Sequence, residues 1–183
     1  IDRSTRLVQQ LLTFSKLTKR KTDDERSRVN VSDIINKVVD SHKITQEKRN
    51  INVCLNIDVT EPVEMETHGE HLAILFDNLY SNSINHTPQG GTISLSLTLV
   101  NNQLTFVVED SGLGVEESEF ARLVVPFQKS KDGRLKGTGL GLAICNRIVA
   151  LHDGQLILSK SLEFKGLAVR AHLFVNASVC TYR

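Results

Sequence analysis

Three asparagines on one predicted helix are the first residues whose types and spacing could do chemistry. Residues 69–85 have the apolar spacing of an amphipathic helix. At 100° per residue, Asn78, Asn82 and Asn85 fall within about 60° of one another on that helix. Asparagine is a poor helix former, and amide oxygens suit Mg²⁺, which takes much of its shell from water and phosphates. The stripe therefore indicates a metal and phosphate site, with a polar helix face that happens to use asparagine as the alternative.

A carboxylate followed by two glycines ends a predicted strand, in the sequence EDSGLG at 109–114. Gly112 and Gly114 allow a tight turn and a close approach of the backbone to a ligand. A buried Asp110 could accept a hydrogen bond from an amino group such as adenine N6. This pattern is weak by itself, because it is also a common turn.

Three glycines at alternate positions open the next predicted helix, in KGTGLGL at 136–142. The backbone N–H groups of Gly137, Gly139 and Gly141 could bind an anion at the helix N-terminus. The pattern is neither a dinucleotide fingerprint nor a Walker loop, because it does not open a βαβ unit and its glycine spacing differs.

The segment before these glycines is basic. Residues 126–136 contain four cations against the one carboxylate Asp132, a net charge of +3; the cations are Lys129, Lys131, Arg134 and Lys136. An ordinary exposed loop would not predict this local charge. We therefore expect a mobile lid over a triphosphate.

The remaining elements indicate an α+β two-layer sandwich, with helices on one face of a mixed sheet. Residues 1–20 form an amphipathic helix, and the charged run 19–28 is expected to be a linker with a boundary near Arg28. Ser32 is the expected N-cap of a following helix. Strands are predicted at 52–58, at 92–99 and 104–108 in a hairpin turned by Asn101-Asn102, and at 156–161 and 167–175, with a helix at 139–152.

Composition excludes several classes of protein. The chain has 183 residues, 40% hydrophobic, and 22 basic against 21 acidic residues, for a net charge of +1. Near-neutral charge, 5% aromatic residues and no Trp argue against a nucleic-acid binder. No apolar run reaches the roughly 20 residues of a membrane span, so no membrane contact is expected. Cys54, Cys145 and Cys180 include no CxxC pair, which excludes a disulfide scaffold or zinc knuckle and favours a reducing compartment.

Taken in order, N-x-x-x-N, D-x-G-x-G, the lid and G-x-G-x-G-L resemble the catalytic ATP-binding domain of bacterial sensor histidine kinases, over about residues 30–175. These kinases belong to the gyrase–Hsp90–histidine kinase–MutL ATPase superfamily. The resemblance implies a Bergerat-type fold, a mixed sheet with helices on one face. Residues 1–20 are similar to the second helix of the family's dimerisation domain. The implied division is a partial dimerisation helix and linker at 1–28 and a catalytic ATP-binding domain at 29–183.

The resemblance also implies roles for individual residues. Asn82 would coordinate Mg²⁺ with Asn78 in support, Asp110 would bind the adenine amino group, and Lys129 would meet the γ-phosphate of ATP. Phe120 and Phe127 would anchor the lid. The other residues that the resemblance places around the nucleotide are Asn85, His86, Gly112, Gly114, Arg134, Gly137, Thr138, Gly139, Leu140, Gly141 and Leu142.

Two positions depart from the family pattern. Asn85 stands where the family usually has Lys or Arg, and His86 stands where an aromatic residue commonly lies against the nucleotide. The phosphoacceptor of the family is a His followed by an acid and, a little later, a Pro. That context is absent around all six histidines, namely His42, His68, His71, His86, His152 and His172. The acceptor helix would therefore precede Ile1; with no initiator Met or signal peptide at its start, the chain is expected to be part of a longer protein.

The resemblance thus implies a protein-histidine kinase that uses ATP and Mg²⁺. Its partners would be the dimerisation and phosphoacceptor domain of the same protein and a response regulator. The intact protein would be a homodimer and an inner-membrane sensor, with this chain in its cytoplasmic part. One alternative is a superfamily ATPase, but such enzymes have a Glu four residues before the metal Asn, where this chain has Asn78. The other alternative, suggested by Asn85, is a nucleotide-binding module without catalysis.

Overall fold

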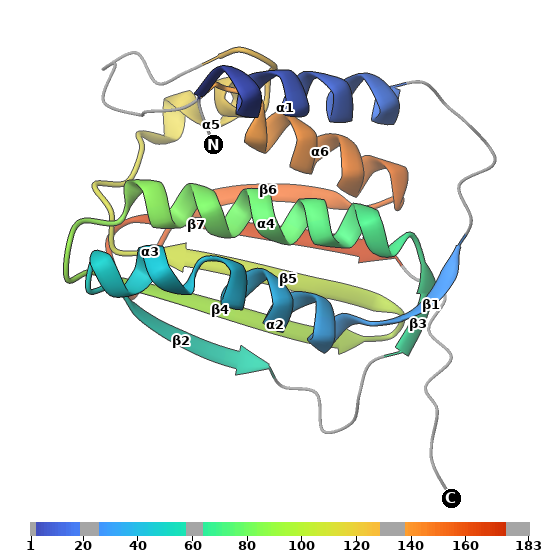
Figure 1. Ribbon diagram of the computed structural model, residues 1–183, viewed down its shortest axis with the longest axis horizontal. Helices are drawn as coiled ribbons and strands as arrows, with labels where there is room; N and C mark the ends of the chain where they lie inside the picture. The colour runs from blue at the N-terminus through green and yellow to red at the C-terminus, as the bar shows by residue number, and fades with distance from the viewer. Residues whose placement is uncertain (1–2, 19–25, 58–63, 129–137, 175–183) are drawn as a thin grey trace, which may run out of the picture.

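The computed structural model describes residues 3–18, 26–57, 64–128 and 138–174, which form a mixed sheet with helices on one face (Figure 1). The predicted α+β class is confirmed. The helices are α1 (Arg3–Thr18), α2 (Val31–Ser41), α3 (Lys43–Lys48), α4 (Gly69–His86), the 3₁₀ turn η1 (Glu117–Glu119), α5 (Phe120–Leu123) and α6 (Gly141–Leu151). The strands are β1 (Ser27–Asn30), β2 (Asn52–Ile57), β3 (Glu64–Thr67), β4 (Thr92–Val100), β5 (Gln103–Asp110), β6 (Gln155–Lys160) and β7 (Leu167–Phe174).

The main sheet has the strand order β2-β4-β5-β7-β6. Only β2 and β4 pair in parallel; the other neighbours in this sheet are antiparallel. The predicted β4–β5 hairpin is confirmed. Its turn places Asn101 and Asn102 at φ of 50° and 62°, which is the conformation that a two-residue hairpin of the mirror-image type requires.

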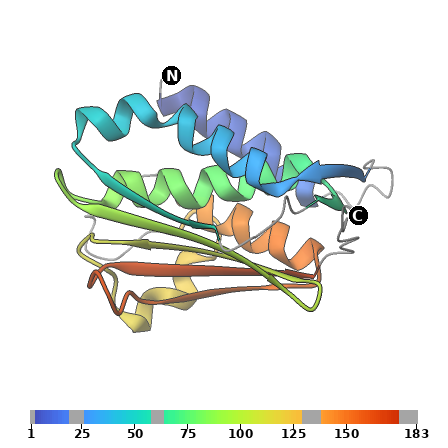
Figure 2. The same ribbon diagram turned by 90° about the horizontal axis from the view of Figure 1, so that it is seen from below.

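Helices α2, α4 and α6 pack side by side on one face of this sheet (Figure 2). The inward-facing residues of β4 and β5 alternate with polar ones, so Leu95, Leu97 and Phe106 are buried. Phe106 contacts Phe76 of α4 with ring centroids 4.4 Å apart. Each such side chain contributes about 1.5–3 kcal/mol when fully buried, and this packing fixes α4 against the sheet.

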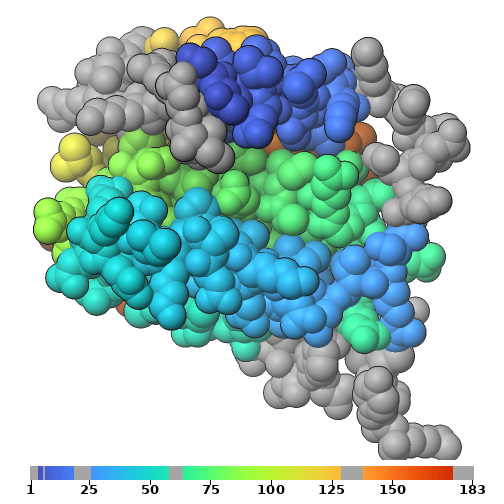
Figure 3. Space-filling model, in the orientation of Figure 1, coloured from blue at the N-terminus to red at the C-terminus, as the bar shows by residue number. Residues whose placement is uncertain are grey.

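Helix α1 packs against α6. Leu7, Phe14 and Leu17 contact the core, and the Arg147 side chain donates a hydrogen bond to the Leu17 carbonyl at 3.1 Å. The space-filling view shows α1, α4 and α2 in that order across one face (Figure 3). The other apolar side of α1 is exposed, with Val8 at 54% and Leu12 at 59%.

Two local predictions were wrong. Ser27 and Arg28 lie in β1 rather than in a linker. Strand β1, which directly precedes α2, pairs antiparallel with β3, which comes just before α4. The N-cap of α2 is Asn30 instead of Ser32: the helix begins at Val31, and the Asn30 side chain accepts a hydrogen bond from the Asp33 amide at 3.3 Å. The proposed domain boundary near Arg28 stays a prediction. Among the described residues, no helix is both long and apolar enough to cross a membrane.

Candidate functional site

The asparagine stripe lies along one edge of α4. Its apolar side packs into the core through Leu72, Leu75, Phe76 and Leu79, all nearly fully buried. This leaves Asn78 and Asn82 half-buried and Asn85 exposed, as the helical spacing predicts. The Asn78 side-chain nitrogen donates to the Ile74 carbonyl at 2.8 Å, which turns its oxygen away from the helix. A Cβ on Gly141 would lie 3.3 Å from that oxygen, so Asn78 faces the beginning of α6.

Asp110 ends β5 as a buried carboxylate, with 2% of its surface exposed. Its Oδ1 accepts from the amides of Gly112 at 2.9 Å and Leu167 at 3.3 Å, and the Ser83 hydroxyl donates to Oδ2 at 3.4 Å. Burial raises the pKa of Asp110, and these three hydrogen bonds oppose the rise. A carboxylate has about four acceptor positions, so one remains for a ligand amino group.

Glycines surround this carboxylate because no side chain fits there. A Cβ on Gly112 would lie 2.8 Å from Asp110 Oδ1 and 2.8 Å from the His86 carbonyl oxygen. Gly166 is closer still, since its Cβ would lie 2.0 Å from the Asp110 carbonyl oxygen. Gly114 has a φ of +68°, a conformation that favours glycine. Gly166 was not predicted as part of the site, because nothing in its local sequence connects it to Asp110.

The C-terminal end of α4 is fixed by Arg49, a second residue that the sequence patterns did not indicate. Its guanidinium donates hydrogen bonds to the carbonyls of Ile84 and Thr87. Cationic groups at a helix C-terminus stabilise the last carbonyls, which have no partner within the helix. Burial of His86 lowers its pKa, and the positive charge of Arg49 lowers it further. His86 is therefore a neutral imidazole at pH 7.

The N-terminus of α6 lies beside Asn78. Leu140 is fully buried and precedes the first helical residue, Gly141, and its side chain makes no capping hydrogen bond. Gly139 has a φ of +75°. Its carbonyl accepts a hydrogen bond from the Phe127 amide at 3.0 Å, which holds these two residues next to each other. The first amides of a helix have no partner within the helix, so they can donate hydrogen bonds to an anion.

The structure describes only some of the site and lid residues that were predicted between positions 120 and 142. Lys129, Arg134 and Gly137 lie outside the described residues. Leu142 is half-buried against the core, and the Thr138 hydroxyl contacts α1. Phe120 packs on the core as expected of an anchor. Phe127 does not: its side chain is 58% exposed, and the contact that it makes with Gly139 is through its backbone amide.

Together these groups form two ends of an elongated site along α4. Asn78 and the start of α6 mark one end, and Asp110, packed against Ser83 and the His86 carbonyl, marks the other. His86 lies eight positions after Asn78 on the helix, a rise of about 12 Å at about 1.5 Å per residue. An acceptor for an amino group at one end and donors for an anion at the other suit a nucleotide.

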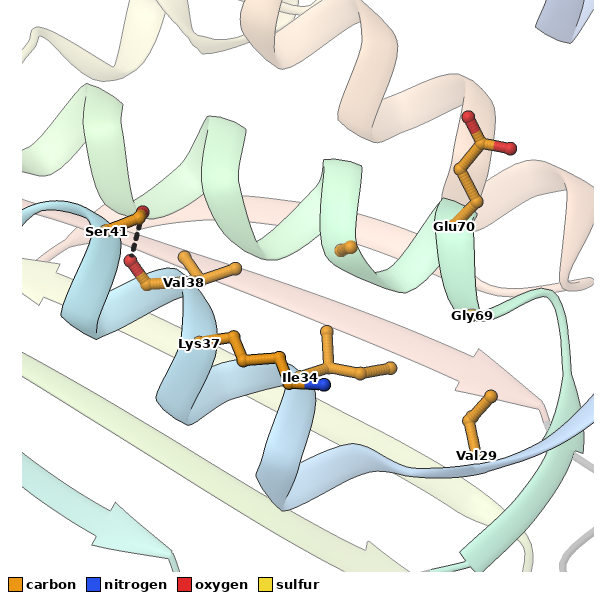
Figure 4. A pocket seen from close by; sticks show the side chains of 8 residues that line it. Val29, Ile34, Lys37, Val38, Ser41, Gly69 and Glu70 are labelled. Atoms are coloured by element: carbon orange, nitrogen blue, oxygen red, sulfur yellow. Dashed lines mark hydrogen bonds between the residues drawn. The ribbon is translucent and has the colours of Figure 1, made fainter.

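A groove of about 450 Å³ between α2 and α4 contains none of these residues (Figure 4). It is lined by Val29, Ile34, Lys37, Val38, Ser41, Gly69, Glu70 and Ala73. Over the described part of the chain, no group of three or more His, Cys, Asp or Glu side chains could hold a metal ion. The metal site expected at Asn82 would use an amide oxygen.

Residues 67–176 match the family model described as "Histidine kinase-, DNA gyrase B-, and HSP90-like ATPase". The chain belongs to this family. Within the family, its relatives are sensor histidine kinases. It is 32% identical over 152 residues to the sensor protein QseC of Escherichia coli O157:H7, a match that covers 83% of this chain and 33% of QseC. It is 27% identical over 178 residues to sporulation kinase D of Bacillus subtilis strain 168, covering 97% of this chain and 34% of that kinase.

Solved structures agree with this assignment. The catalytic domain of the histidine kinase ThkA is 25% identical and superimposes with a TM-score of 0.73, covering 81% of this chain and 97% of that domain. Full-length ShkA in complex with AMPPNP, at 21% identity, shares the fold with a TM-score of 0.82 over 94% of this chain and 36% of ShkA. The described unit is a histidine kinase-type catalytic ATPase domain. The chain spans about a third of the length of the curated relatives it matches.

Proposed function

We propose that this domain binds ATP with Mg²⁺ and transfers the γ-phosphoryl group to a histidine on a dimerisation helix of the same protein. The observation that carries the proposal is the position of the buried carboxylate Asp110 and of the N-terminus of α6 at opposite ends of the asparagine stripe. The first end suits an adenine amino group, and the second suits phosphates. The domain would act in a homodimeric inner-membrane sensor that passes the phosphoryl group to a response regulator.

Each residue of the site has a defined task in this proposal. Asp110 accepts a hydrogen bond from the adenine amino group, and neutral His86 lies against the base. Asn82 offers its side-chain oxygen to Mg²⁺, with Asn78 beside it. The amides at the start of α6 hold phosphate oxygens, and the glycines that precede it let the backbone approach. Bound Mg²⁺ neutralises phosphate charge, which together with positioning is most of what phosphoryl transfer asks of a protein.

Three positions of the lid enter from the family resemblance. Lys129 is proposed to meet the γ-phosphate, with Arg134 adding charge and Gly137 a backbone contact. Because Asn85 is neutral where the family usually has a cation, we assign that positive charge to the lid.

Three of the six histidines, His42, His152 and His172, are held by hydrogen bonds within the domain, which supports an acceptor elsewhere. His152 is 8% exposed and is bonded to the Thr67 hydroxyl and the Ile148 carbonyl. His172 is bonded to Thr105 in the sheet, and His42 contacts Asp77 at 2.8 Å. A phosphoacceptor has to present a ring nitrogen to the γ-phosphate, and these contacts hold the rings in other directions.

Hydrolysis of ATP by a superfamily ATPase is less well supported. Water activation requires a carboxylate that can accept a proton, and the amide of Asn78 cannot. The neighbouring carboxylate, Asp77, faces His42, which lies between α2 and α3. A nucleotide-binding module without catalysis is the other alternative, and it differs from a kinase only in the transfer step.

Transfer to a separate acceptor tests the proposal. The chain is mixed with γ-labelled ATP, Mg²⁺ and a separately produced dimerisation domain from a relative such as QseC. The same reaction is run in parallel with the Asn82→Ala variant of the chain. We expect acid-labile, alkali-stable label on the acceptor with the parent chain and little with the variant. ATP binding without any label on the acceptor would favour the module, and free phosphate without label would favour the ATPase. Label on the chain itself would contradict the assignment of the acceptor.

A further inference from the structure

Helix α1 reaches the phosphate end of the site through one side chain, Gln10. Its amide nitrogen donates to Asn78 Oδ1 at 3.4 Å, and its amide oxygen accepts from the Thr138 hydroxyl at 2.6 Å. Gln10 therefore joins two residues of the proposed site that lie on different elements. It is also half-buried, unlike its neighbour Gln9, which is exposed.

The bridge occupies groups that a bound nucleotide would use. Asn78 has both of its side-chain groups engaged, the nitrogen with the Ile74 carbonyl and the oxygen with Gln10. The Thr138 hydroxyl donates to Gln10 and accepts from the Leu140 amide at 3.3 Å. The Leu140 amide, just before α6, is thus bonded to a Thr138 hydroxyl whose position is fixed by Gln10.

The rest of α1 holds Gln10 in this position. Leu7 and Phe14 pack against the core on either side of it, and the Leu17 carbonyl is held by Arg147 of α6. Because these contacts fix the backbone of α1, they keep the Gln10 side chain within reach of Asn78 and Thr138, and the bridge in turn adds to the contacts that dock the helix. The state of the helix and the state of the site are therefore linked.

We propose that docked α1 competes with the Mg²⁺-triphosphate group of ATP for Asn78 and Thr138, with Gln10 as the competing side chain. This inference rests on the proposed function of the same site. Binding of MgATP releases Gln10 and loosens α1. By linkage, a docked α1 weakens MgATP binding by the same factor. Adenosine, which reaches only the Asp110 end, does not compete with Gln10.

Calorimetry on the full chain tests the competition. Gln10→Met keeps the length of the side chain and its apolar stem but removes both hydrogen bonds, and Gln9→Met is the matched control on the same helix. We expect Gln10→Met to bind MgATP about two- to tenfold more tightly than the parent chain, the worth of one released hydrogen bond. Adenosine affinity should be equal in all three proteins. A Gln10→Met chain that binds MgATP as the parent does, or more weakly, would overturn the inference.

Hydrogen exchange of the parent chain provides a second readout. The amides of α1 should exchange faster in MgATP than in adenosine, because only the triphosphate displaces Gln10. Unchanged exchange of α1 at saturating MgATP would overturn the competition while leaving ATP binding, and so the proposed function, intact. If neither the parent nor Gln10→Met binds ATP at all, the proposed function itself fails, and this inference fails with it.

Discussion

The backbone of Gly166 lies directly against Asp110. A Cβ on Gly166 would be 2.0 Å from the Asp110 carbonyl oxygen and 2.5 Å from Oδ1. The next residue, Leu167, donates its amide to the same Oδ1. The turn before β7 thus forms one wall around the carboxylate, and only a residue without a side chain allows it.

Replacing Gly166 with Ala should damage both the fold and the site. The new methyl group would meet backbone atoms, which cannot rotate away, so we expect a loss of about 1–3 kcal/mol in the free energy of unfolding. ATP affinity should fall as well, because Asp110 has to move. Urea denaturation and calorimetry measure the two effects. Gly90→Ala is the control: Gly90 has a φ of +76° in open space, so the substitution should cost about 1 kcal/mol without changing ATP affinity. Equal losses of stability and of ATP affinity in the two variants would contradict the close contact between Gly166 and Asp110.

Replacing Asp110 with Asn should weaken ATP binding and keep the hydrogen bonds that hold the side chain. The Asn side chain can still accept from the Gly112 and Leu167 amides, and its nitrogen can donate to the Ser83 hydroxyl. The adenine amino group, however, loses a charge-assisted bond worth about 1.5–3 kcal/mol, so ATP affinity should fall roughly ten- to a hundredfold by calorimetry. The parent chain should prefer ATP to GTP, which has no amino group at that position. Equal affinities for ATP and GTP would refute the adenine-reading role.

The same substitution should change the pH dependence of stability. Burial raises the pKa of Asp110 above its ordinary value near 3.8, so the folded state holds the proton more tightly than the unfolded state. The free energy of unfolding therefore falls as pH rises from about 4 through the raised pKa. Asp110→Asn removes this loss, and its thermal stability relative to the parent should be higher at pH 7 than at pH 3. A constant difference between the two proteins across that range would mean that the carboxylate is not strained by burial.

His86 should titrate below its ordinary pKa of 6.5, because burial and the charge of Arg49 both favour the neutral ring. As pH falls from 6.5, the unfolded state takes up a proton before the folded state does, so the free energy of unfolding falls with pH through that window. His86→Gln should make this decline shallower. Burial also lowers the pKa of His152, so part of the decline should remain in the variant.

Ring-proton NMR of His86 gives the most direct measurement. Its pKa should move up towards 6.5 in Arg49→Gln, where the nearby positive charge is gone. Exposed Gln89 provides the control, and Gln89→Asn should leave both the titration of His86 and the pH dependence of stability unchanged. A His86 pKa that does not respond to Arg49→Gln would contradict the electrostatic contact.

Short-range patterns in the sequence predict most of the fold. The helical spacing of Asn78, Asn82 and Asn85 predicts their common edge, and strict alternation predicts the β4–β5 hairpin and its turn. These features depend on residues within a few positions of one another, so propensity and periodicity determine them. The buried position of Asp110 follows from its place at the end of such a strand.

Contacts between distant segments are not predictable in this way. Gly166 meets Asp110, and Gln10 meets Thr138, only because the sheet and the helices bring separate segments together. The role of Arg49 has no sequence signal for the same reason: its partners lie on α4 or just after it, 35 and 38 positions away. The parallel pairing of β2 with β4 depends on contacts between distant segments in the same way. So does the pairing of β1 with β3, in which the first two residues of β1, Ser27 and Arg28, were predicted to be linker.

Replacing Asn82 with Ala should reduce the effect of Mg²⁺ on ATP binding and leave the fold intact. Asn82 is half-buried at the edge of α4, so removing its amide opens no cavity in the core, and Ala is the better helix former. In calorimetric titrations, the parent chain should bind ATP more tightly with Mg²⁺ than with EDTA, and the variant should show little difference. Exposed Asn36 on α2 is the matched control, and Asn36→Ala should keep the full response to Mg²⁺. An Asn82→Ala chain that unfolds at the parent temperature and responds to Mg²⁺ as the parent does would exclude Asn82 as the metal ligand.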